Sequence, residues 1–144
     1  MTDIAINPVT RRVQFQGTTG TGPFAFNFNI LQASDIAVYK NNTLLSIGTG
    51  ATNYSVSIAS NGTGSVSVVT ALIASDVLVI IGGRELSRTT DFVTAGDLLA
   101  SSLNEQLDSN VVMSQQLDES ISRSIRAQPG DTEKTLTLPL IADR

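Results

Sequence analysis

The chain has 144 residues, of which 41% are hydrophobic and 15% charged, a composition typical of folded proteins and too apolar for a disordered one. The absence of Cys excludes a disulfide framework, and the absence of His removes the commonest general base and metal ligand. A formal net charge of −4 disfavours nucleic-acid binding, which needs a basic surface. The strongest apolar run, 77–81, is far shorter than the roughly 20 residues of a membrane span. We therefore expect neither a nucleic-acid partner nor a membrane.

Short segments in which apolar and polar residues alternate fill the first part of the chain, as in half-buried β-strands. The clearest is Phe24–Ile30, where FAFNFNI places three phenylalanines and an isoleucine on one face and the small and polar residues on the other. Asp76–Ile81 is continuously apolar, as expected for a strand buried on both faces. Other strands are predicted at 10–16, 35–40, 43–47, 53–58 and 65–69, with Gly- and Asn-rich turns between them. About seven short strands with this spacing predict a small β-sandwich or barrel-like domain, so the fold class is mainly β.

A long helix is predicted from 102 to 126, where the chain has neither Gly nor Pro, and Pro129-Gly130 ends it. Ser102 and Glu105 have capping-box spacing and predict its start, after a short helical turn at 95–100. One face carries an apolar stripe with a serine in the middle, formed by Leu103, Leu107, Val111, Ser114, Leu117, Ile121 and Ile125. The stripe advances about 3.67 residues per step, which favours nearly straight helices over a left-handed supercoil.

The length of this helix bears on its partner. An amphipathic helix more often packs on its own domain than on another molecule, and that is the first alternative. A helix of about 25 residues is, however, about 37 Å long, more than a β domain of this size can cover. We therefore expect part of the stripe to need another partner. Three copies of the chain would provide it, so the stripe is predicted to be a homotrimer interface.

A polar connector, 84–96, joins the predicted β domain to the helix and contains Arg84, Arg88, Asp91 and Phe92. Asp91 is close in sequence to both arginines. We expect a local ion pair that pins the connector, and prefer this interpretation to a catalytic site.

The remaining chemical groups predict no active site. Asp118 and Glu119 are adjacent on a helix and point in different directions, so a solvated face accounts for both. Asp35 and Asp76 each precede a strand, as turn residues do. The glycine-rich loop 17–22 lacks the Lys-Ser/Thr ending of a phosphate-binding loop and precedes no helix. We expect no enzymatic activity, no metal and no cofactor.

The connector and the helix entry carry a resemblance to a known family. The motifs are the aromatic strand at 24–28, the apolar strand at 77–81, SRTTDF at 87–92, Gly96 and LLASSLN at 98–104. In this order they resemble the N-terminal domain of tail fibre and tailspike proteins of short-tailed phages. Each motif is loose alone, but their order and spacing over about residues 10–130 are moderately specific.

The resemblance implies a homotrimeric structural virion protein, made in the bacterial host cytoplasm and located in the phage tail, where it fastens the fibre for host attachment. Its partners would be itself, phage tail, adaptor or nozzle proteins, and a further fibre protein at its C-terminal end. It divides the chain into a β-sandwich attachment domain (1–83), a connector (84–96), a long helix or trimeric neck (97–128) and an extended, strand-like tail leading toward a shaft (129–144).

Two alternatives stay open. In the family, receptor binding or glycan cleavage lies in a large C-terminal part, whereas this sequence stops at Arg144, so the chain is either a portion of a fibre or a stand-alone trimeric tail adaptor. The other alternative is a carbohydrate-binding β-sandwich adhesin with an oligomerising helix. That function would need exposed aromatic rings to stack on sugars, and the chain has no Trp and two Tyr.

Overall fold

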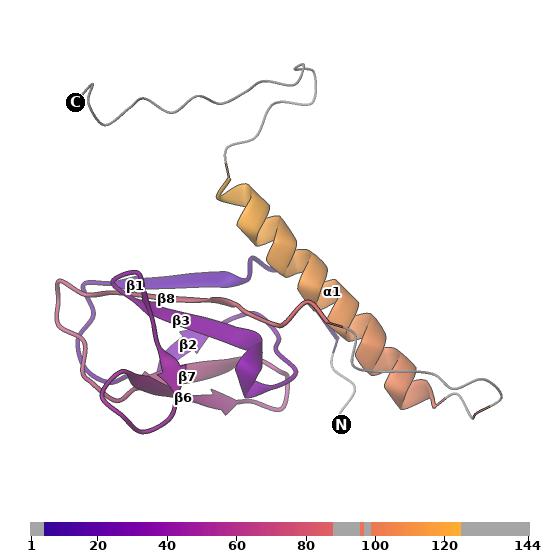
Figure 1. The fold of residues 1–144 in the computed structure, drawn as a ribbon, viewed down its shortest axis with the longest axis horizontal. Helices are drawn as coiled ribbons and strands as arrows, with labels where there is room; N and C mark the ends of the chain where they lie inside the picture. Colours follow the sequence, from indigo (N-terminus) through magenta and orange to yellow (C-terminus); the bar gives the residue numbers. More distant parts are fainter. Residues whose placement is uncertain (1–4, 88–95, 97–98, 125–144) are drawn as a thin grey trace, which may run out of the picture.

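The structure is a computed structural model that describes residues 5–87, 96 and 99–124. In these ranges the chain forms eight strands in two sheets, followed by one α-helix. Figure 1 shows the two sheets stacked and the helix running diagonally past one end of them. The mainly β fold class and the long helix after the β domain are therefore confirmed.

The two sheets have four strands each, in the orders β1-β8-β3-β4 and β2-β7-β6-β5. All neighbouring strands are antiparallel except β5 and β6, which are parallel. A short 3-10 helix, η1, leads into β3. The bounds are β1 Arg12–Gln16, β2 Phe24–Phe26, η1 Ala33–Asp35, β3 Ile36–Lys40, β4 Thr43–Leu44, β5 Ser46–Ile47, β6 Asn53–Ile58, β7 Gly64–Val68, β8 Val77–Gly82 and α1 Ala100–Ser122.

One apolar core lies between the sheets. Strands β3 and β8 contribute residues from one side, and β2, β6 and β7 contribute residues from the other. Alternate residues of each strand point into this core, which is why the period-2 pattern located the strands. Val38, Val66, Leu78 and Ile80 are fully buried.

The segment predicted as one strand at 24–30 is only partly a strand. β2 ends at Phe26, yet Phe28 and Ile30 continue the buried face beyond it. Asn29, expected on the polar face, is buried instead, because its Nδ2 donates to the backbone oxygen of Asn61 at 2.7 Å. The prediction of a core wall was right, and the predicted strand length was wrong.

Strand β8 is not buried on both faces, contrary to expectation. Its residues alternate, with Leu78 and Ile80 in the core and Val77, Val79 and Ile81 half-buried on the outer face. Within the described ranges no further layer covers that face of the sheet, so an apolar sequence did not guarantee two-sided burial here.

The arm predicted at 43–47 divides between the two sheets. Asn41 and Asn42 adopt positive φ values of 49° and 65° and turn the chain so that β4 pairs with β3, as expected for a hairpin. Leu45 then enters the core, and β5 pairs in parallel with β6 in the other sheet. A single hairpin arm was therefore the wrong prediction for residues 46–47.

The helix begins earlier and ends earlier than predicted. Residue 99 is the N-cap of α1, and no side chain in the described part of the chain caps the first turn, so the capping box at Ser102 and Glu105 was wrong. Arg123 is the C-cap. The turn predicted at 95–100 rests largely on residues that the structure does not describe, as do Ile125 and the tail at 129–144.

Candidate self-association face

Helix α1 has two opposite faces with different surroundings. Ser109, Val112 and Glu119 are buried against the β domain. With 3.6 residues per turn, the predicted stripe lies on the other side of the helix from these three residues. The helix therefore does pack on its own domain, as the first alternative held, but not through its apolar stripe.

Arg84 is the centre of the contact between α1 and the β domain. It directly follows Gly83, just after β8, and its Nη1 donates to both carboxylate oxygens of Asp35 at 2.8 Å. Its Nε donates to the Oγ of Ser109 on α1 at 2.9 Å. One side chain thus connects the end of a sheet to the buried face of the helix.

Gln116 adds a second contact with the same residue through the backbone. Its Oε1 accepts a hydrogen bond from the Arg84 N–H at 2.8 Å, and its Nε2 donates to the Arg84 carbonyl oxygen at 3.0 Å. One helix side chain therefore satisfies both backbone groups of a residue that lies beyond the last strand. The neighbouring Gln115 donates from Nε2 to the carbonyl oxygen of Asn7 at 2.8 Å.

Arg84 has an ion-pair partner that was not predicted, and the predicted pair with Asp91 stays a prediction. Asp35, expected to be an ordinary turn residue, is 1% exposed and pairs with Arg84. Its Oδ2 also accepts hydrogen bonds from the backbone N–H groups of Leu31 and Gln32. The predicted partner Asp91, with Arg88 and Phe92, falls outside the residues that the structure describes. Of the predicted connector residues, only Arg84 can be placed, and it is a structural hub.

Arg11 is fully buried next to this junction, although no pattern in the sequence indicates a buried cation. Its guanidinium lies over the Phe28 ring, 4.8 Å from the centroid, and Nη1 donates to the Asn29 carbonyl oxygen at 2.7 Å. Burial lowers the pKa of Arg11 from its ordinary value to about 10. Nothing in the alternation of apolar and polar residues distinguishes Arg11 from its neighbour Arg12.

Asp118 and Glu119 also have different surroundings, although both were expected on a solvated face. Asp118 is exposed, whereas Glu119 is buried and forms two hydrogen bonds with Arg123, at 2.7 Å and 2.9 Å. The prediction for Glu119 was therefore wrong. An i, i+4 pair of this kind supports the last turn of the helix.

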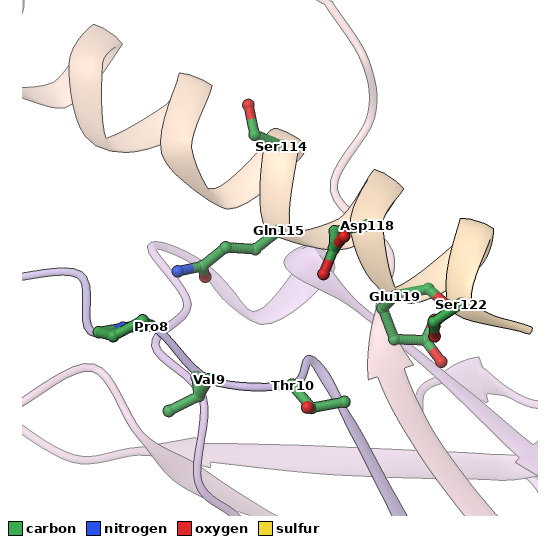
Figure 2. Close-up of a pocket in the computed structure, with 8 residues that line it drawn as sticks. All are labelled: Pro8, Val9, Thr10, Ser114, Gln115, Asp118, Glu119 and Ser122. Atoms are coloured by element: carbon green, nitrogen blue, oxygen red, sulfur yellow. Dashed lines mark hydrogen bonds between the residues drawn. The ribbon is translucent and has the colours of Figure 1, made fainter. Parts of the chain in front are cut away.

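A hollow of about 500 Å³ separates the last turns of α1 from residues 8–10. Figure 2 shows the side chains of Gln115, Asp118 and Glu119 on the side toward Pro8–Thr10, and Ser114 pointing the opposite way. The described residues contain no group of three side chains able to hold a metal ion. With the Glu119 carboxylate held by Arg123, the hollow offers no arrangement typical of acid–base catalysis.

The predicted stripe is the most exposed apolar feature of the helix. The exposed fractions are 37% for Leu103, 52% for Leu107, 44% for Val111, 47% for Leu117 and 47% for Ile121, and Ser114 is exposed between them. Five large apolar side chains are therefore exposed along one face of the helix and do not belong to the core. We call these six residues the outer stripe.

No protein-family model matches the chain, and no curated protein matches it either. Among the described residues, no helix combines the length and hydrophobicity needed to pass through a lipid bilayer.

Proposed function

We propose that this chain is a structural virion protein, the N-terminal module that anchors a trimeric phage tail fibre or tailspike to the virion tail. The observation that carries the proposal is the opposition of the two faces of α1. The helix contacts its own β domain through Ser109, Gln116 and other largely polar groups, and its apolar outer stripe points away. As far as residues 5–87, 96 and 99–124 are concerned, the stripe is thus free for other copies of the helix.

The outer stripe is suited to a neck of several helices. A helix of 23 residues is about 34 Å long. Burying one Leu or Val side chain contributes about 1.5–3 kcal/mol, so five such residues in each of three helices would stabilise an assembly substantially. None of the stripe residues is charged, so copies can approach without repulsion along it. In this arrangement each β domain lies on the outside of the neck.

The attachment role rests on the family resemblance together with this geometry. A β domain held outside a central neck leaves its sheets free to contact a tail, adaptor or nozzle protein. In a fibre protein, the far end of the neck would continue toward a shaft. In a stand-alone adaptor, the same end would bind a further fibre protein. The neck is the same in both cases.

The proposal is tested by placing charges in the stripe. Leu107→Asp combined with Leu117→Asp is expected to convert a trimer into monomers, measured by size-exclusion chromatography with light scattering. The matched control is Ser101→Asp with Ser120→Asp, which adds the same two charges at exposed helix positions outside the stripe. The far-UV circular dichroism of the β domain should not change in either variant. A wild-type chain that is monomeric both at micromolar concentration and in assembled particles would refute the proposal.

The carbohydrate-binding alternative has less support. Phe24, Phe26, Phe28 and Tyr54 are all buried in the core. Within the described ranges only Phe15 and Tyr39 keep partial exposure, which leaves few rings able to stack on a sugar. Titration with bacterial surface glycans tests this function directly, and saturable binding would favour it.

A further inference from the structure

Two columns of residues run along the outer face of α1 with a spacing of seven. One consists of Leu103, Asn110 and Leu117, and the other of Leu107, Ser114 and Ile121. Residues seven apart on an α-helix lie nearly above one another. Each column is apolar at both ends and polar in the middle. The exposed face therefore has a polar layer, Asn110 with Ser114, between two apolar layers.

The hydrogen bonds around Asn110 leave its side-chain donor available. Its Oδ1 accepts a hydrogen bond from Gln106 Nε2 at 3.0 Å, and its backbone oxygen accepts one from Ser114 Oγ at 2.8 Å. Both contacts lie within α1. In the described part of the chain the Asn110 Nδ2 donates to no acceptor, and the residue is exposed. In the described part of the chain, the Asn110 amide thus lies exposed on this face with only its oxygen bonded.

We propose that Asn110 and Ser114 form a polar layer in the trimeric neck that fixes the register of three copies of α1. This inference rests on the proposed function and adds to it the residue that selects the register and the number of helices. The occupant of the face is two further copies of the same helix. Neither column contains a charge. A second copy of α1 in the same register places apolar residues against the apolar layers and polar residues against the polar layer.

The physical reason is the cost of burying an unpaired amide. In a three-fold assembly the helices are parallel, so three in-register copies bring their Asn110 side chains together, where each can donate to the next. A slip of seven residues would place Asn110 against Leu103 or Leu117 of a neighbour and bury the amide without a partner. A polar residue within an otherwise apolar seam is known to specify register and helix number at some loss of stability.

Asn110 also distinguishes two descriptions of the stripe. A step of about 3.67 residues passes through Val111 and predicts nearly straight helices. A step of 3.5 residues passes through Asn110 instead, and predicts a left-handed supercoil with a polar centre. The two descriptions share every other residue from Leu103 to Ile121, so substitution of Asn110 separates them.

The test uses the natural absence of cysteine. A Leu103→Cys chain has a single thiol in the first apolar layer, and in-register trimers are expected to form one disulfide per trimer on oxidation. Adding Asn110→Leu should lower this yield by about threefold or more and convert one trimeric species into a mixture of sizes, seen by native mass spectrometry. Asn104→Leu is the matched control, because it makes the same replacement at an exposed position outside both columns. It should leave yield and size unchanged.

A second variant, Asn110→Ala, removes the amide without adding apolar bulk and is read in the same way if Asn110→Leu precipitates. The inference is overturned if both Asn110 variants keep a single trimeric species with the wild-type disulfide yield. A trimeric wild-type chain with that outcome would leave the proposed function standing. A monomeric wild-type chain would overturn both.

Discussion

Asp35 and Arg84 lie 49 residues apart in the sequence and form a buried ion pair, with the Arg84 Nη1 2.8 Å from both carboxylate oxygens. The sheet brings them together. Ile36, directly after Asp35, is paired with Gly82 in the β3–β8 register, and the Gly83 N–H donates to the Asp35 carbonyl oxygen. The pair therefore closes the end of this sheet at the point where α1 packs.

Arg84→Met should lower the free energy of unfolding strongly. It leaves the Asp35 carboxylate buried without its cation and removes the bond to Ser109, and breaking a buried pair in this way costs about 3 kcal/mol. Arg12→Met is the control, since the Arg12 side chain donates an exposed hydrogen bond to Gln14, whose loss should cost less than about 0.5 kcal/mol. Urea unfolding followed by circular dichroism at fixed protein concentration measures both. Equal losses would contradict the role given to Arg84.

The stability contributed by Asp76 should disappear in acid. The backbone N–H of Ile73, then the side chains of Asn41 and Lys40, lower the pKa of Asp76 from 3.8 to about 2. The folded state thus binds the proton less tightly than the unfolded state, so the carboxylate stabilises the fold above its ordinary pKa, and this stabilisation is lost as the pH falls toward 2. Asp76→Asn should unfold at a lower temperature than wild type at neutral pH.

The difference between the two melting temperatures should shrink as the pH falls from about 4 to about 2, because wild-type Asp76 becomes protonated there. Thermal unfolding of both proteins over this range measures it. A difference that stays constant with pH would show that the carboxylate charge is not what stabilises the turn.

Strand positions were predictable because they depend on local alternation. Asn53–Ile58 was predicted to the residue, and residues 12–16 and 36–40 fell within predicted segments. These segments have one face in a core and the other in solvent, which is the situation that a period of two encodes. The exposed stripe of α1 was predictable for the same reason, from a helical period.

The contacts of Arg84 and Arg11 were not predictable, because they depend on which strands are neighbours. Nearness in sequence points only to Asp91 as a partner of Arg84, and the pairing of β3 with β8 is what brings Asp35 to it. Burial of Arg11 depends on Phe28 and on the carbonyl of Asn29, and neither follows from the residues around position 11. Alternation locates a strand but does not give its neighbours.

Two adjacent valines should respond differently to truncation. Val112 is fully buried against the β domain, whereas Val111 is 44% exposed in the outer stripe. In the Leu107→Asp, Leu117→Asp background, expected to be monomeric, Val112→Ala should cost about 2 kcal/mol through lost burial and a cavity. Val111→Ala should cost less than about 0.5 kcal/mol there. Urea unfolding measures both losses. A larger loss for Val111→Ala than for Val112→Ala would show that the other face of α1 packs on the β domain.

Gln116→Ala should loosen α1 from the β domain. It removes both hydrogen bonds to the backbone of Arg84 and leaves an N–H and a C=O partly buried without partners. An unsatisfied buried group costs about 1–3 kcal/mol, so amide hydrogen exchange within α1 should become about tenfold faster or more in the same monomeric background. The loss is local, because the core between the two sheets is not touched, and exchange in β6 and β7 should not change.

Gln106→Ala is the matched control, since the Gln106 side chain bonds to Asn110 within the helix itself. In the monomeric background it should leave exchange close to that of the parent protein. If amide exchange in α1 is equally fast in the two glutamine variants, the two hydrogen bonds between Gln116 and the Arg84 backbone do not hold the helix on the β domain. In that case Val112 and the Arg84–Ser109 bond must supply most of the docking free energy, which the Val112→Ala and Arg84→Met measurements would show.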